Sequence, residues 1–98
     1  MDIIKTINDK DLTVKVSGRL DTNTSGALEE ELNASLDGME SLTLDFSDLE
    51  YMSSSGLRIL LVYQKRMNKQ GTMKLVHVND FIMDILQMTG FADILTIE

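Results

Sequence analysis

Cysteine, proline and tryptophan are absent from this sequence of 98 residues, and histidine occurs once. The absence of cysteine excludes disulfides, thiolate metal sites and cysteine nucleophiles, and it fits a reducing cytosol. We therefore expect a cytoplasmic protein whose core is held by packing alone. Apolar residues make up 43% of the chain, which suffices for one core. With no Gly/Ser-rich linker or repeat, residues 1–98 are predicted to form a single domain.

Basic residues are few. The chain has 9 lysines and arginines against 16 acidic residues, a formal net charge of -7. Such a surface repels phosphate backbones and anionic headgroups, so direct nucleic-acid or membrane binding is not expected. No segment approaches the roughly 18 consecutive apolar residues of a membrane span. The start of the chain, Met1–Lys5, also has neither the basic start nor the long apolar run of a secretory leader.

Residues able to catalyse a reaction are sparse. The single histidine, His77, lies within a predicted strand, where recruiting it to a Ser/His/Asp triad would be difficult. Gly26 and Gly56 stand alone rather than in a phosphate-binding loop. The acidic run at 29–31 turns around a predicted helix and indicates a solvated face, not a metal site. We predict no enzymatic activity, metal or cofactor; a serine hydrolase using Ser54 is the remaining enzyme hypothesis, and it lacks a base.

Alternating and helical periodicities divide the chain into eight predicted elements. Strands are predicted at 3–7, 12–17, 42–46, 73–78 and 94–97. Helices are predicted at about 23–37 and 54–70, and a third follows the capping pair Asn79–Asp80 with Phe81, Ile82, Ile85 and Leu86 inward. Most of the methionines at 67, 73, 83 and 88 are interpreted as core. The order ββαβαβαβ predicts an α/β fold, a largely parallel mixed sheet with an N-terminal hairpin, covered by helices.

Three consecutive serines, Ser53–Ser55, precede Gly56 at the start of the second predicted helix. A serine at this position can cap a helix by accepting a backbone hydrogen bond, which is its ordinary structural role. Capping needs only one serine. The small residues also keep this corner accessible, so a second interpretation is that another protein or a phosphate approaches here.

The segment Asp45–Leu61 resembles the signature of STAS proteins, in which a strand, an aspartate-containing turn and an Asp-Ser-Ser/Thr-Gly-Leu helix start follow in order. Gly18–Asp21 is similar to the Gly-x-Leu-Asp turn of that family. Met88–Phe91 is similar to its Met-Ser/Thr-Gly-Leu/Phe motif. The resemblance covers essentially the whole chain and implies a STAS-like fold.

Within that family the chain resembles anti-sigma-factor antagonists, which implies a docking module that is not an enzyme. Its partner would be an anti-sigma factor with a histidine-kinase-like ATPase fold, which phosphorylates the serine corresponding to Ser54, and a serine phosphatase would reverse this. Transcription would be regulated indirectly. We call Ser54 and eight neighbouring residues the switch surface; the eight are Asp21, Thr22, Asn23, Ser53, Ser55, Gly56, Leu57 and Arg58.

Ser53 stands where the family has an aspartate before the phosphoacceptor. This removes a fixed negative charge and adds a hydroxyl. An alternative hypothesis is therefore a STAS scaffold or ligand-sensing module of another signalling pathway that is not phosphorylated. Arg58 lies four residues after Ser54, about one helical turn along, so it can pair with a phosphate on Ser54 or remain a solvated helix residue.

Overall fold

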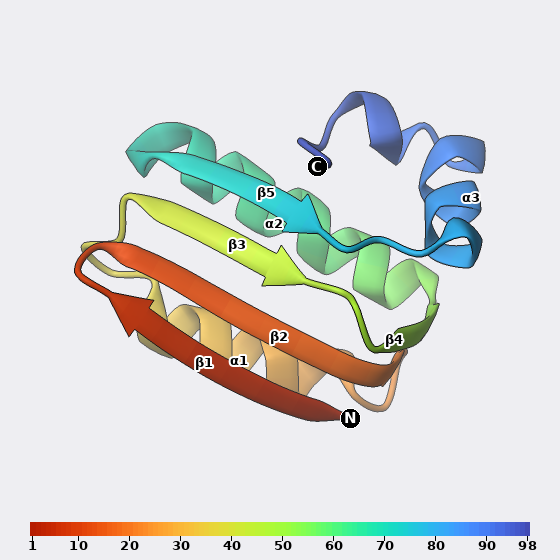
Figure 1. Ribbon diagram of the computed structural model, residues 1–98, viewed down its shortest axis with the longest axis horizontal. Helices are drawn as coiled ribbons and strands as arrows, with labels where there is room; N and C mark the ends of the chain where they lie inside the picture. The colour runs from red at the N-terminus through yellow and green to blue at the C-terminus, as the bar shows by residue number, and fades with distance from the viewer.

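Five strands form one mixed sheet in the computed structural model, which describes residues 1–98 (Figure 1). The strands are β1 (Asp2–Asn8), β2 (Asp11–Leu20), β3 (Ser41–Asp45), β4 (Leu49–Met52) and β5 (Thr72–Val76). The helices are α1 (Ser25–Ser35), α2 (Ser54–Gln70) and α3 (Asp80–Met88), followed by a short 3-10 helix, η1 (Phe91–Asp93).

The strand order is β1-β2-β3-β5, and β4 pairs with the far end of β2. β1 and β2 are antiparallel, while β2 pairs in parallel with both β3 and β4, and β3 with β5. Parallel neighbours require crossovers, which α1 and α2 provide. The expected α/β class and the N-terminal hairpin are confirmed.

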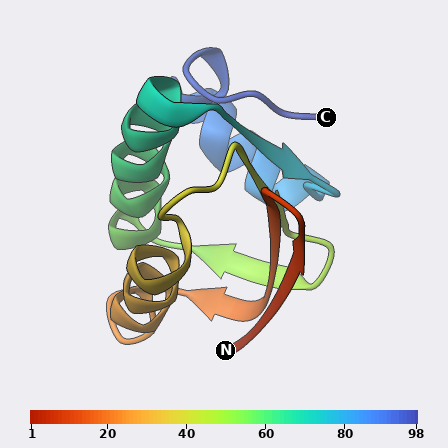
Figure 2. The same cartoon turned by 90° about the vertical axis from the view of Figure 1, so that its left-hand side faces the viewer.

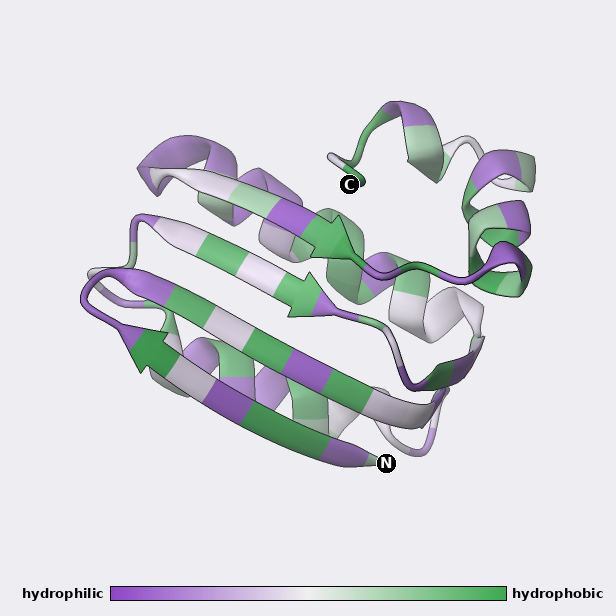
Figure 3. Cartoon of the chain, in the orientation of Figure 1, coloured by the Kyte–Doolittle hydropathy of each residue, from purple (hydrophilic) through white to green (hydrophobic).

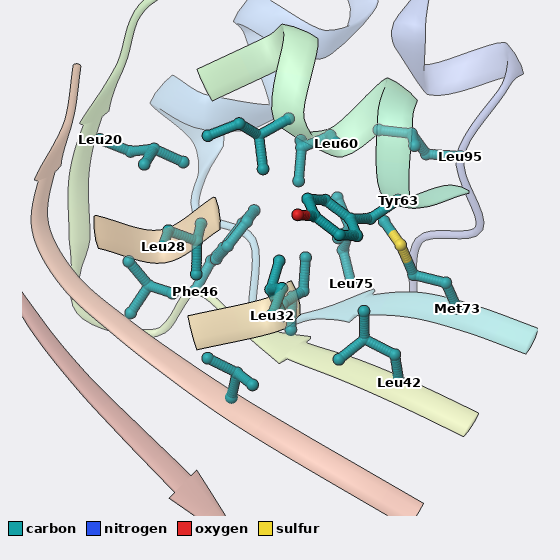
Figure 4. Packing of buried hydrophobic residues seen from close by; sticks show 14 of the residues in the cluster. Leu20, Leu28, Leu32, Leu42, Phe46, Leu60, Tyr63, Met73, Leu75 and Leu95 are labelled. Carbon is teal, nitrogen blue, oxygen red and sulfur yellow. The ribbon is translucent and has the colours of Figure 1, made fainter. Parts of the chain in front are cut away.

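Helices α1 and α2 lie side by side on one face of the sheet, and α3 lies at its end beside β4 (Figures 1 and 2). Apolar and polar residues alternate along β2 and β3, so each strand turns one row of side chains toward the helices (Figure 3). The opposite face carries no helix. The inward row joins α1 and α2 in a single cluster of 22 buried apolar residues, part of which is drawn in Figure 4.

Tyr63 of α2 fastens the two helices together. Its ring is buried, and its hydroxyl donates to Asn33 Oδ1 at 2.7 Å and lies 3.1 Å from the Glu29 carbonyl oxygen, both on α1. Burial, reinforced by the Glu29 carboxylate, raises the pKa of Tyr63 above its ordinary value. The hydroxyl therefore stays protonated and continues to donate to α1, which fixes the position of α1 relative to α2.

Two details of the predicted element order are wrong. A strand, β4, lies between β3 and α2, where none was predicted. Only the first and the last of its four residues are buried, so the strand shows no alternation of buried and exposed residues. The strand predicted at 94–97 is reduced to one bridge between Ile97 and Leu75. The 3-10 helix occupies 91–93 and Ile94 keeps a helical backbone, which leaves few residues free to extend along β5.

Three residues differ from their predicted environments. His77 lies outside the strand, because β5 ends at Val76 and His77 adopts a left-handed backbone with φ of 57°. Phe81 was predicted to face inward but is 54% exposed. Met88 is 86% exposed, whereas Met67 and Met73 are in the core as predicted. No helix combines the length and the apolar character that a membrane crossing requires.

Candidate functional site

The turn after β2 and the start of α2 meet at one corner of the molecule, and this brings the residues of the switch surface together. β4 runs parallel to the end of β2, pairing Leu20 with Met52. The Ser53 amide then donates to the Leu20 carbonyl oxygen at 2.9 Å. The two segments, more than thirty residues apart in sequence, are therefore joined by backbone bonds directly beneath the corner.

Asp21 organises the turn that precedes α1. Its carboxylate accepts from the Asn23 amide at 3.0 Å and lies 3.3 Å from the Thr24 hydroxyl. Desolvation pushes the pKa of Asp21 upward, but the hydrogen bonds from Asn23 and Thr24, with Arg19, outweigh it and hold the pKa below its ordinary value. The ionised carboxylate fixes the turn, so α1 begins at Ser25 and not at 23 as predicted.

Ser53 occupies the capping position of α2, yet its hydroxyl makes no capping hydrogen bond. The Oγ atom is buried and has no hydrogen-bond partner. Ser53 therefore does not fill the capping role that was open to any of the three serines, because its hydroxyl satisfies no backbone amide. A buried Oγ is also shielded from a modifying enzyme, so Ser53 is not an equivalent alternative to Ser54.

Ser54 is the first residue of α2 and is exposed. The first amides of a helix have no partner within the helix, and they carry the positive end of its dipole. A negative group on the Ser54 oxygen would thus lie where the helix itself favours it.

Ser55 connects the two halves of the corner. Its Oγ lies 3.3 Å from the Thr22 Oγ1, so the hydroxyl groups share one hydrogen bond across the junction. Thr22 and Asn23 are exposed, and Ser55 is half-buried. The bond holds the exposed turn against the start of α2.

Gly56 and Leu57 are buried, so they lie in the packed layer beneath the exposed residues of the switch surface. A β-carbon at position 56 would lie 2.8 Å from the Met52 Cγ and 2.9 Å from the Leu20 Cγ. The expectation that Gly56 keeps the helix start accessible from outside is wrong. The missing side chain serves the close packing of α2 on Leu20 and Met52 instead.

Replacing Gly56 with alanine should lower the free energy of unfolding by about 1–2 kcal/mol, because overpacking outweighs the gain in helix propensity. Chemical denaturation measures the change. Gly26→Ala is the matched control, since nothing lies within 4 Å of its missing β-carbon. That variant should be unchanged or more stable by up to about 1 kcal/mol. Equal stability of the two variants would contradict the packing role of Gly56.

Arg58 reaches across to α1. Its Nη2 lies 3.4 Å from the Glu29 Oε2, and the Arg58 side chain remains 60% exposed. Arg58 is therefore paired with Glu29, but only weakly, because an exposed ion pair contributes at most about 1 kcal/mol.

His77 is the only histidine, and its side-chain bond is to Asp45, with Nδ1 and Oδ1 3.1 Å apart. Desolvation raises the pKa of Asp45, but the Ser47 amide and His77 more than compensate and lower it. None of the serines at 53–55 is hydrogen-bonded to His77. His77 is therefore not placed as the base of a Ser54 nucleophile.

Two further features of the structure were not predicted from the sequence. The guanidinium of Arg19 lies over the Tyr51 ring, 4.2 Å from its centroid, and the Tyr51 and Phe81 rings are 6.5 Å apart. The strand β4 that carries Tyr51 was not predicted, so no signal in the sequence placed these rings together. A polar hollow of about 570 Å³ lies on the open face of the sheet, and its lining includes no residue of the switch surface.

Comparison with known proteins identifies the family. A family model described as "Mlab, STAS domain" matches residues 4–96. The anti-sigma-B factor antagonist of Bacillus subtilis is 29% identical over 92 residues, which cover 93% of this chain and 84% of that protein. The anti-sigma F factor antagonist of Paenibacillus polymyxa is 33% identical over 89 residues, covering 88% and 76%.

A solved structure gives the same result. The crystal structure of an anti-sigma factor antagonist from Mycobacterium paratuberculosis superposes with a TM-score of 0.88 at 26% identity, covering 98% of this chain and 83% of that one. These three relatives are named as regulatory antagonists, and none of the three is named as an enzyme. With the corner at the start of α2 formed by the motifs that the family shares, the chain belongs to the STAS domain family.

Proposed function

We propose that this protein is an anti-sigma-factor antagonist, which binds an anti-sigma factor through the switch surface and is released when Ser54 is phosphorylated. The observation that carries the proposal is the exposed Ser54 at the first position of α2, on a corner fastened by backbone bonds. The names of the relatives support the same partner. The partner, a kinase of the histidine-kinase-like ATPase fold, supplies the ATP, and a serine phosphatase restores the hydroxyl.

The chemistry of the switch is electrostatic. A phosphate adds about -1.5 to -2 charges at neutral pH. Within the domain, the amides at the start of α2 stabilise that charge by donating hydrogen bonds to it. A partner packed against the same corner would instead have to bury the charge at an interface that excludes water. Phosphorylation thus separates the complex without unfolding the antagonist.

Arg58 is available to the phosphate. It lies one helical turn after Ser54, and its present bond to Glu29 is long and exposed. A phosphate on Ser54 would compete with Glu29 for the guanidinium and hold it with a stronger, doubly charged acceptor. This would draw Arg58 away from α1 and toward the corner.

Phosphate transfer from the partner tests the proposal. The purified chain, incubated with ATP and the anti-sigma factor kinase of its own organism, should gain one phosphate, which peptide mass spectrometry places on Ser54. Ser54→Ala should abolish the transfer, whereas Ser53→Ala should retain it because the Ser53 hydroxyl is buried. Phosphate on Ser53, or on neither serine while the kinase binds the chain, would contradict the assignment of Ser54.

A second candidate function is a STAS scaffold or ligand-sensing module of another signalling pathway that is not phosphorylated. Ser53 in the place of the family's aspartate favours it, since the fixed negative charge beside the phosphoacceptor is missing. Native mass spectrometry of the purified chain distinguishes the two. A bound small molecule, together with no phosphate transfer, would support the second function.

A further inference from the structure

The switch surface is too small to be a whole protein interface. It contains nine residues, of which Gly56 and Leu57 are buried. A standard interface involves about 20–30 residues on each side. A partner seated on Ser54 must therefore contact a neighbouring part of the surface as well.

One flank of the corner has the composition of an interface centre. Arg19, Tyr51 and Phe81 form a continuous stack, with the guanidinium over Tyr51 and the Tyr51 ring tilted by 32° against Phe81. Phe81 is 54% exposed and the Arg19 side chain 61% exposed. Tyrosine, phenylalanine and arginine are enriched at interfaces, and tyrosine and arginine dominate their binding energy. We call these three residues the aromatic stack.

The aromatic stack is continuous with the switch surface. Arg19 contacts both, since its Nε lies 3.6 Å from the Asp21 Oδ2 while its guanidinium covers Tyr51. Tyr51 is also only two residues before Ser53, at the end of the strand that leads into α2. A partner that covers the corner reaches the stack without crossing another element.

The helix that carries Phe81 is fastened to β4 although the Phe81 ring is exposed. Asn79 donates to the Leu49 carbonyl oxygen at 2.8 Å and accepts from the Ile82 amide at 2.9 Å. One side chain thus caps α3 and fastens the helix to β4. The backbone of Phe81, two residues along, is thereby held beside β4, and its ring centroid lies 6.5 Å from that of Tyr51. A rigid aromatic anchor loses little conformational entropy on binding.

We infer that the aromatic stack of Arg19, Tyr51 and Phe81 is the second half of the partner's footprint. This rests on the proposed function. The occupant is the anti-sigma factor kinase, which should present an apolar pocket to the two rings and a carboxylate beside it to Arg19. The carboxylate would be complementary to the Arg19 guanidinium, whose side chain is 61% exposed.

The test is the affinity of the unphosphorylated full chain for the kinase, measured by titration calorimetry. Tyr51→Ala/Phe81→Ala should weaken binding about 30-fold or more, and Phe81→Ala alone, which leaves β4 intact, about 10-fold. Thermal unfolding verifies that both variants remain folded. Met88→Ala, on the same helix and 86% exposed, is the matched control and should change affinity by less than about twofold.

The alternative is that the partner's contact area extends from the switch surface along α2, where Val62 is 42% exposed. If Val62→Ala weakens binding and Phe81→Ala does not, the partner extends along α2 and the inference is wrong. Wild-type binding that both aromatic variants retain would overturn the inference alone. A wild-type chain that does not bind the kinase would contradict the proposed function, and the inference with it.

Discussion

The Ser54→Glu variant is expected to bind the anti-sigma factor kinase about 100-fold more weakly than the wild-type chain, a loss of about 2.7 kcal/mol. Glutamate places a permanent negative charge at the exposed first residue of α2. The helix start tolerates that charge, so the cost falls on the complex, where the carboxylate must give up water against a packed surface. Titration calorimetry on purified proteins measures the effect.

Ser54→Gln separates charge from size, since it has the length of glutamate without its charge. It should bind at least about 10-fold more tightly than Ser54→Glu, and the difference should shrink at high salt as the charge is screened. Circular dichroism should find all variants equally folded. If Ser54→Glu binds as tightly as the wild-type chain, the electrostatic switch is excluded.

The Gly71→Ala variant is expected to lose about 3 kcal/mol of unfolding free energy, the largest stability effect that we predict. Gly71 ends α2 just before β5, and a β-carbon there would overlap the carbonyl oxygen of Glu40. That oxygen also accepts from the Thr72 amide at 3.0 Å. Because backbone is displaced and not a flexible side chain, relief would disturb the first pairing of β5 with β3.

Chemical denaturation of Gly71→Ala, beside Gly26→Ala, measures this cost. Both variants change glycine to alanine, but the missing β-carbon of Gly26 has no neighbour within 4 Å. Any effect of the substitution on the unfolded chain is therefore shared, and the difference reports the clash. A difference below about 1 kcal/mol would mean that the α2–β5 connection is looser than its geometry implies.

Most of the fold could be predicted because its elements have clear periodicity. The second helix was predicted at about 54–70 and spans Ser54–Gln70, with a glycine that ends it and an apolar face on which Ile59, Leu60 and Met67 are buried. β4 could not be predicted, because it is short and pairs only with the last residues of β2. Its existence depends on a tertiary contact that no local pattern records.

The chemistry of the corner was predicted only in part. The motifs identified which residues lie together, and backbone bonds join Leu20 to Ser53 as that requires. Burial could not be inferred from the small size of the residues. Gly56 proved to be buried for packing, and Ser53 carries a hydroxyl with no partner, although both had been interpreted as parts of an accessible helix start.

The bonds that fasten the corner, from the Ser53 amide to Leu20 and between Thr22 and Ser55, have a consequence for how information passes through the protein. A corner that is already ordered loses little conformational entropy when a partner binds, so ordering it reduces the affinity very little. The partner kinase and the phosphatase would then meet the same backbone in both states. They would distinguish the two states by the phosphate on Ser54 and by the Arg58 side chain that it attracts, with no change of backbone to transmit.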